Sequence, residues 1–224
     1  MAHQLLFDLV ADLVEAVDMP DPVVEFGSMQ VEEWQPNDLR PLFAGRDFTG
    51  TDFRAGPGVD RVEDLRELGF ADEEVGTALC LETLEHCEDP FAACRELHRV
   101  ISPGGICVVS SVMLFGIHGY PNDYWRFTPE GLRVLLDRFD DVSVASMGDP
   151  ESPVFVFGIG AKGRKLGVEL AEMPSIRAAQ QAHENAYGKV RLGPMRYSLR
   201  DLARDAGSQL PRVVRERLAA KRAS

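Results

Sequence analysis

The sequence of 224 residues lacks any run of about 18 apolar residues, the length that a membrane-spanning helix needs. Its first residues also lack the apolar stretch of a signal peptide, because Asp8 and Asp12 interrupt the early leucines and valines. Only four cysteines occur, and no two of them form a CxxC pair. A disulfide framework is therefore not expected. We predict a cytoplasmic protein with no membrane partner, whose thiols are reduced and mostly buried.

Positive charge is scarce, with 24 Lys and Arg residues against 36 Asp and Glu and a net charge of −12. This balance disfavours a nucleic acid as the main partner, because binding the phosphate backbone requires a basic surface. The charge is uneven, since residues 161–224 hold 14 basic and 6 acidic residues, whereas residues 1–160 hold 10 and 30. A basic arm packed on an acidic body explains this asymmetry. A separate anionic partner and a homodimer contact through the arm are the alternatives.

Metal-binding patterns are missing as well, because no cluster of carboxylates and histidines points to Mg²⁺ or Zn²⁺. The spacing of seven residues between Cys80, Cys87 and Cys94 suits one side of a helix better than a metal site. We therefore expect no bound metal.

Apolar periodicity and turn residues predict strands that alternate with helices, and hence a parallel sheet wrapped on both faces. Two late strands lie close together in the sequence, which predicts an antiparallel hairpin at one sheet edge. A basic, mainly helical arm follows, so we divide the chain into residues 1–160 and 161–224. Helices are expected at residues 4–18, 90–101 and 128–139, with a short one at 37–43. Strands are expected at residues 23–27, 48–52, 59–62, 75–81, 106–111, 142–147 and 154–159.

Acidic residues and a glycine follow the first three predicted strands, where a doubly wound sheet binds its ligands. Gly27 follows the first strand and permits close approach of a ligand to the backbone. Asp52 ends the second strand, where a carboxylate can accept both hydroxyls of a ribose. Asp64 follows the third strand, beside a possible slot for an adenine. Taken alone, each of these residues is also consistent with an ordinary turn.

The segments LETLEHCEDP at residues 81–90 and RELHRVISPGG at residues 95–105 have an informative order and spacing. Over roughly residues 20–160 the sequence resembles the class I S-adenosylmethionine-dependent methyltransferases, and in particular their type-11 group of small-molecule enzymes. The resemblance implies a Rossmann-like, doubly wound sheet of seven mostly parallel strands with an antiparallel pair. It also implies S-adenosylmethionine as cofactor. The cofactor-binding residues that it implies are Glu25, Gly27, Ser28, Asp52, Phe53, Asp64, Leu65, Leu81, Glu82 and His86.

One departure from the family concerns the loop after the first strand, which reads EFGSMQ where many relatives have further glycines. Met29 and Gln30 restrict the approach of a ligand to the backbone. Either this loop takes another path, which we favour, or cofactor affinity is lowered or lost.

The segment HGYPNDYWRFT at residues 118–128 resembles one found in a type-11 subgroup associated with natural-product or polysaccharide biosynthesis. The resemblance implies a substrate-facing loop. We expect His118 to act as general base with Asp123 beside it, because an imidazole has a suitable pKa near about 6.5. The candidate substrate-binding residues are Tyr120, Tyr124, Trp125 and Arg126. The alternative is that Tyr124, Trp125 and Phe127 pack under the sheet while Asp123 pairs with Arg126.

The resulting prediction is methyl transfer from S-adenosylmethionine to a hydroxyl or amine of a small molecule. An alternative is a non-catalytic protein of the same fold that binds or assembles with a partner, with a degenerate cofactor loop. A nicotinamide-dependent oxidoreductase is disfavoured, because Gly27 stands alone where such enzymes need a G-x-G-x-x-G turn. A nucleic-acid methyltransferase is disfavoured by the acidic body.

Overall fold

A computed structural model describes residues 2–30, 38–119, 121–187, 190–192 and 195–197. The chain forms two compact units, Met1–Gln180 and Gln181–Ser224. None of the helices in the described ranges is long and apolar enough to cross a membrane. The helices are α1 (Ala2–Ala16), α2 (Pro90–Val100), α3 (Pro129–Leu135) and α4 (Pro174–Tyr187), with 3₁₀ turns at Arg40–Phe43, Leu84–His86 and Leu170–Glu172. The strands are β1 (Val23–Phe26), β2 (Phe48–Asp52), β3 (Arg61–Val62), β4 (Val75–Leu81), β5 (Ile101–Val112), β6 (Asp141–Asp149), β7 (Ser152–Ala161), β8 (Val190–Leu192) and β9 (Met195–Tyr197).

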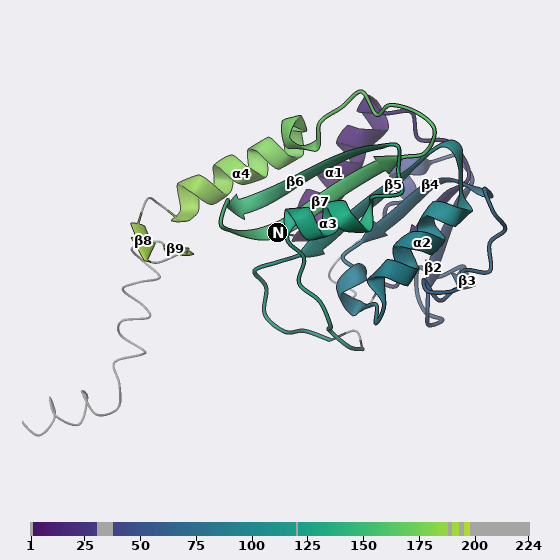
Figure 1. Ribbon diagram of the computed structural model, residues 1–224, viewed down its shortest axis with the longest axis horizontal. Helices are drawn as coiled ribbons and strands as arrows, with labels where there is room; N and C mark the ends of the chain where they lie inside the picture. The colour runs from purple at the N-terminus through teal and green to yellow at the C-terminus, as the bar shows by residue number, and fades with distance from the viewer. Residues whose placement is uncertain (1, 31–37, 120, 188–189, 193–194, 198–224) are drawn as a thin grey trace, which may run out of the picture. The chain divides into compact units, whose positions relative to one another are not determined.

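Seven of these strands form one sheet in the order β3-β2-β1-β4-β5-β7-β6 (Figure 1). Strands β1 to β5 pair in parallel, whereas β7 runs antiparallel to both β5 and β6. The predicted mostly parallel sheet with an antiparallel hairpin at one edge is confirmed. The parallel strands all end at the same edge, which brings the residues that follow β1, β2 and β4 together.

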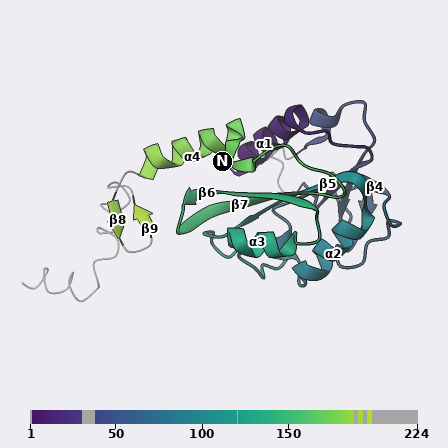
Figure 2. The same ribbon diagram turned by 45° about the horizontal axis from the view of Figure 1, so that its top comes forward.

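Helices cover both faces of the sheet, with α1 on one side and α2 and α3 on the other (Figure 2). Alternate residues of β5 enter two different hydrophobic clusters, as the period of two in a strand requires. Val108 packs with residues of α1, and Val109 packs with residues of α2 and α3. Burial of both faces explains why β4 and β5 are almost continuously apolar.

Helices α2 and α3 begin at the residues that the sequence predicted. Asp89 accepts a hydrogen bond from the Ala92 N–H at 2.9 Å, and Thr128 Oγ1 accepts one from the Gly131 N–H at 3.0 Å. A proline stands in the first turn of each helix, where its missing N–H costs nothing. These caps fix the starts of the two helices that pack against the sheet beside its ligand-binding edge.

Two expectations from the sequence need correction. Strand β5 begins at Ile101 rather than at residue 106, because the chain turns directly out of α2 into the sheet. Gly104, with φ of +85°, provides the irregular backbone at this point. The four cysteines are free and buried as predicted, but they do not lie on one side of a helix. Cys80 lies in β4 and Cys94 in α2, and the two meet in one core.

The first compact unit continues beyond the predicted boundary at residue 160. Leu166, Leu170, Met173 and Ile176 are buried in the cluster that also contains the apolar face of α1. Strands β8 and β9 pair with each other in an antiparallel hairpin that the sequence analysis did not predict. Residues 198–224 lie outside the described residues, and the helical character expected of them stays a prediction.

Candidate functional site

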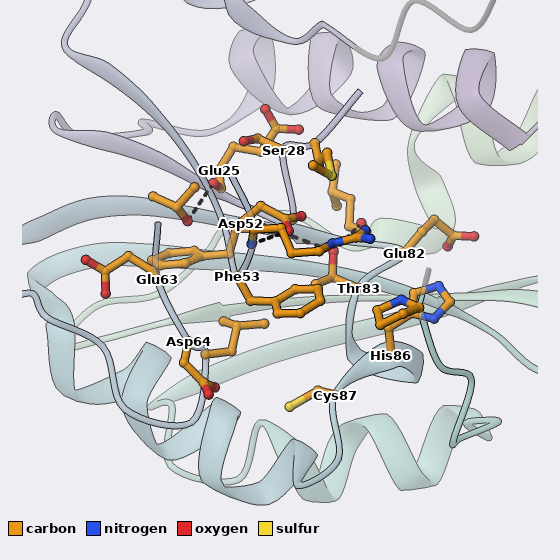
Figure 3. Close-up of a pocket in the computed structure, with 18 of the residues that line it drawn as sticks. Glu25, Ser28, Asp52, Phe53, Glu63, Asp64, Glu82, Thr83, His86 and Cys87 are labelled. Carbon is orange, nitrogen blue, oxygen red and sulfur yellow. Dashed lines mark hydrogen bonds between the residues drawn. The ribbon is translucent and has the colours of Figure 1, made fainter. Parts of the chain in front are cut away.

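A cavity of about 620 Å³ lies at the carboxyl ends of β1, β2 and β4. Its volume is typical of a small-molecule site, for which about 300–1,000 Å³ is usual. Figure 3 shows Asp52 and Phe53, from the end of β2, and His86, from beyond β4, facing the same space. Every residue for which the sequence resemblance implied cofactor binding lines this cavity: Glu25, Gly27, Ser28, Asp52, Phe53, Asp64, Leu65, Leu81, Glu82 and His86.

The floor of the cavity is formed where β1 ends. Glu25 is buried there, and burial raises the pKa of its carboxyl group to about 8, while the nearby charge of Arg40 opposes the rise. Gly27 follows with φ of +86°, a backbone conformation that favours glycine. A Cβ atom at this position would lie 2.1 Å from Thr83 Oγ1, which donates a hydrogen bond to the Leu81 carbonyl. Gly27 is therefore required both by the turn and by the close packing of the two loops.

Asp52 and Phe53 project from the end of β2. Burial raises the pKa of the Asp52 carboxyl group, and hydrogen bonds from backbone N–H groups, including that of Arg54 at 3.0 Å, oppose the rise. The Phe53 side chain is half exposed, and the Arg54 guanidinium lies 4.9 Å from its ring centroid. A fixed carboxylate and an accessible aromatic face are thus side by side at this wall of the cavity.

The acids after β3 have different surroundings. Asp64 forms a two-pronged ion pair with Arg66, and this hydrogen bonding lowers the pKa of the Asp64 carboxyl group. Glu63 is buried, accepts a hydrogen bond from the Gly69 N–H at 2.7 Å and pairs with Arg61. Glu63 therefore supports the loop, whereas Asp64 reaches the cavity with part of its carboxylate already engaged.

The loop after β1 takes a path that accommodates its unusual residues. Ser28 Oγ donates to the Gly58 carbonyl at 2.9 Å, and the Gln30 N–H donates to the Pro57 carbonyl at 2.9 Å. A Cβ atom at Gly56 would lie 2.3 Å from the terminal methyl carbon of Met29. The facing loop therefore has glycines where a side chain would collide with Met29 or Gln30, and Ser28 and Met29 both line the cavity.

Two acidic side chains follow β4. Glu82 has a positive φ of 47°, and one of its carboxylate oxygens accepts a hydrogen bond from Ser110 Oγ at 3.1 Å. Burial raises the pKa of Glu82 to about 8, and the neighbouring carboxyl group of Glu85 adds to the rise. Both carboxyl groups therefore stand just after β4, where the charge of one opposes the ionisation of the other.

His118 lines the cavity from the loop that follows β5. Its backbone N–H donates to Asp123 Oδ2 at 2.8 Å, and its ring Nδ1 lies 3.2 Å from the same oxygen. Both guanidinium Nη atoms of Arg126 also contact Asp123, at 2.5 and 2.7 Å, and this pairing lowers the pKa of Asp123 far below its usual range. Arg126 additionally donates to the carbonyls of Phe115 and Gly116. Asp123 and Arg126 thus hold the loop in shape.

The loop matches each of the two sequence interpretations only in part. Asp123 pairs with Arg126, as the alternative expected, and neither of them lines the cavity. Phe127 packs into the core, but Tyr124 and Trp125 stay 46% and 40% exposed. Tyr124 lines the cavity and Trp125 does not. Tyr120 lies outside the described residues.

Sequence reasoning missed the approach of His118 to the residues after β4. The rings of His86 and His118 lie 4.8 Å apart between centroids at 85° to each other. One ligand atom from each of Glu85, His86 and His118 lies within 4.8 Å of the others. Glu85 and His86 are adjacent in the sequence and could have indicated a group of metal-ligating side chains. Their partner His118, however, follows His86 by 32 residues. Leu6 and Phe7 of α1 also line the cavity, and no sequence motif marked them.

Comparisons with known proteins agree with this architecture. Residues 43–109 match the family model described as a methyltransferase domain. A SAM-dependent methyltransferase from Archaeoglobus fulgidus is 13% identical, with 71% of this chain and 94% of that chain covered and a TM-score of 0.54. The 1,6-didemethyltoxoflavin-N1-methyltransferase of Burkholderia thailandensis, solved with S-adenosylhomocysteine, is 16% identical, with 73% and 79% covered and a TM-score of 0.52. No curated protein sequence matches the chain significantly.

The residues of the cavity fit S-adenosylmethionine, the cofactor of this fold. Asp52 and Phe53 place a carboxylate and an aromatic face in the cavity, groups that suit a ribose and an adenine, and Glu25 is buried beside the Gly27 turn. At these low identities the solved structures establish the fold, and the family model adds the sequence of one part of the domain. The chain therefore has the fold of the class I S-adenosylmethionine-dependent methyltransferases, and part of it, residues 43–109, matches the methyltransferase-domain model.

Proposed function

We propose that this protein transfers the methyl group of S-adenosylmethionine to a hydroxyl or amine of a small molecule. The observation that carries the proposal is that one cavity is lined both by the predicted cofactor residues and by His118. The cofactor supplies an electrophilic methyl group, and the protein contributes mainly by aligning the acceptor with it. A natural product or a saccharide is the acceptor class that we favour. The relative that acts on 1,6-didemethyltoxoflavin is consistent with a small acceptor.

The residues of this chain divide the task of binding. Asp52 accepts hydrogen bonds from the ribose hydroxyls, because its position at the end of β2 is fixed by backbone hydrogen bonds. Phe53 and Leu65 enclose the adenine, and Asp64 accepts from its amino group. Glu25, Leu81 and Glu82 face the amino-acid part. Tyr124, whose hydroxyl accepts a hydrogen bond from Asn122 at 2.9 Å, forms a wall for the acceptor.

His118 is the group that we assign to proton removal from the acceptor. Its Nδ1 lies 3.1 Å from the Gly116 carbonyl and 3.2 Å from Asp123, and both of these oxygens can only accept hydrogen bonds. Nδ1 therefore carries the hydrogen, and Nε2 keeps the lone pair that a general base needs. Asp123 acts as a positioning residue through this contact and does not itself touch the acceptor.

Calorimetric titration with S-adenosylmethionine and S-adenosylhomocysteine tests cofactor binding. We expect micromolar binding to the wild type, and at least a tenfold loss in Asp52→Asn, because hydrogen bonds to a charged group contribute about 1.5–3 kcal/mol. Asp137→Asn, an exposed carboxylate after α3, is the matched control and should bind normally. A wild type that binds neither ligand would contradict the proposal and favour a non-catalytic binding or assembly role.

His118→Ala tests the base once a panel of hydroxylated and amino acceptors has identified a substrate. We expect turnover to fall by about 10²–10⁴, the usual contribution of general base catalysis, with cofactor affinity unchanged. The measurement is the rate of S-adenosylhomocysteine formation as a function of pH. Unchanged turnover in a folded variant would show that the proton leaves by another route.

A further inference from the structure

The carboxyl group of Glu85 is buried, and only one of its two oxygen atoms has a hydrogen-bond partner among the described residues. The residue is fully buried, and its Oε2 accepts a hydrogen bond from Ser111 Oγ at 2.7 Å. Among the described residues, Oε1 has no hydrogen-bond partner. An unsatisfied buried acceptor is costly, at about 1–3 kcal/mol, and often marks the place of a missing ion or water.

Two imidazoles lie within reach of this carboxylate. Ligand atoms of Glu85, His86 and His118 lie within 4.8 Å of one another. Ligands that bind one cation tetrahedrally at about 2.1 Å are separated from one another by about 3.4 Å. The separations must therefore shorten by up to about 1.4 Å to bring all three ligands onto a common ion. His118 lies in a loop without helix or strand, which can make such an adjustment.

Both rings are already held in the state that a metal ligand requires. His86 Nδ1 lies 2.5 Å from the Asn122 carbonyl, and His118 Nδ1 contacts the Gly116 carbonyl and Asp123. Because carbonyl oxygens only accept, Nδ1 carries the hydrogen in both rings and Nε2 carries the lone pair. Histidines that bind metals almost always donate their second ring N–H to a carbonyl or carboxylate in this way.

Arg126, a basic residue near Glu85, does not neutralise the Glu85 carboxylate by a direct hydrogen bond among the contacts of the described residues. Arg126 is near enough to Glu85 to interact electrostatically, but its guanidinium donates to Asp123 and to the carbonyls of Phe115, Gly116 and Trp125. The Glu85 backbone carbonyl accepts from the Tyr124 N–H at 2.8 Å, which holds the loop against the turn at residues 84–86. These contacts involve neither Oε1 of Glu85 nor Nε2 of His86 and His118, which stay available to an ion.

We propose that Glu85, His86 and His118 bind a divalent transition-metal cation of the Zn²⁺ or Co²⁺ type at the wall of the cavity. Two imidazoles and one carboxylate suit such cations better than Ca²⁺, which prefers oxygen ligands only. Because His86 and His118 both line the cavity, the remaining coordination positions face the acceptor. Where the proposed methyl transfer holds, Nε2 of His118 binds either a proton or the cation. With the cation in place, a hydroxyl bound to it would have a lower pKa and would release its proton to solvent water instead of to the imidazole.

The experiment uses the full chain, freed of any affinity tag and treated with a chelator, and titrates it with Zn²⁺ by calorimetry and with Co²⁺ by visible absorption. We expect one ion per chain with micromolar or tighter affinity. His118→Ala and His86→Ala should each weaken binding at least 100-fold, and Glu85→Gln, which keeps the shape of the side chain, at least tenfold. His98→Ala is the matched control, because His98 lies on α2 outside the cavity and should leave binding unchanged.

Binding that is undetectable at millimolar Zn²⁺, or equal in the wild type and the three ligand variants, would overturn the proposal. Cofactor titrations of the same samples separate this result from the function proposed above. Asp52→Asn should lose S-adenosylmethionine and keep Zn²⁺, whereas Glu85→Gln should lose Zn²⁺ and keep S-adenosylmethionine. Thermal unfolding of each variant confirms that it is folded.

Discussion

The carboxyl group of Glu25 is buried at the end of β1, and burial raises its pKa to about 8 from an ordinary value of 4.5. Between these two values the folded protein keeps a proton that the unfolded chain releases. The free energy of unfolding therefore falls as pH rises through this range, by an amount on the order of 2–4 kcal/mol. Urea unfolding of the ligand-free protein at pH 5, 6, 7 and 8 should show this decline.

Glu25→Gln stays neutral at every pH and should remove the part of the decline that Glu25 causes. Glu82, whose pKa is also raised to about 8, should leave a smaller decline in that variant. Glu15→Gln, an exposed position on α1, is the control and should behave as the wild type does. An identical pH dependence in Glu25→Gln and the wild type would show that Glu25 is not responsible.

The positions of single residues in the cavity were predictable because these residues stand at strand ends. Gly27 follows a short apolar strand and Asp52 ends the next predicted strand, and the parallel sheet brings such ends together. Glu85 was not predictable as a partner of His118, because that contact joins two loops through tertiary packing. Local sequence also leaves open whether Arg126 faces a substrate or Asp123. The structure decides between these by directing its donors at the loop's own carbonyls.

At the scale of elements, the described residues between β5 and α3 form no helix or strand, and Arg126 links several of them through its guanidinium group. Replacing it by lysine removes the planar, two-pronged contact with Asp123 and leaves fewer donors for the carbonyls around it. We expect Arg126→Lys to ease local opening of this loop by about 1–3 kcal/mol, which corresponds to roughly 5–100-fold faster amide exchange. Hydrogen exchange read by mass spectrometry at residues 113–128 measures this directly.

Arg133→Lys is the matched control for that experiment. Arg133 is half exposed on α3 and approaches Glu130 at 3.8 Å, a surface contact that contributes little. Its exchange pattern should equal that of the wild type. If Arg126→Lys exchanges no faster than Arg133→Lys, the clamp does not hold the loop. The ordered conformation of this loop could not be predicted from the sequence, because Arg126 stabilises it through backbone carbonyls and no periodic apolar pattern marks such contacts.

Elements with a clear apolar period or a capped start were predicted well, and those that depend on neighbours were not. The caps of α2 and α3 are local, so Asp89 and Thr128 identified them. The early start of β5 is not local, because residues 101–105 join the sheet through pairing with β4 and through the Gly104 contact with Lys162. Gly104 and its neighbours look like a turn in the sequence and serve as the irregular start of a strand in the fold.

At the scale of the whole molecule, the packing of residues 161–180 onto the sheet determines where the first compact unit ends. The sequence changes from acidic to basic near residue 160, and charge alone therefore suggested a boundary there. Hydrophobic burial decides otherwise, because Leu170 and Ile176 are almost completely buried against the apolar face of α1. Charge composition describes the surface of a chain, whereas its domain limits follow the buried residues.

Two truncated chains and one substitution test this continuity. A chain that ends after Tyr187 retains this packing and should unfold at nearly the same urea concentration as the full protein. A chain that ends after Ala161 exposes the apolar face of α1, and we expect it to unfold at much lower urea or to aggregate. Leu170→Ala in the full chain should lower the free energy of unfolding by about 2–5 kcal/mol, the usual cost of truncating a buried leucine.

Equal stability of the two truncated chains would instead place the end of the domain near residue 160. Since α1 supplies Leu6 and Phe7 to the cavity, the loss of its packing should also abolish cofactor binding, which calorimetry on the shorter chain would measure.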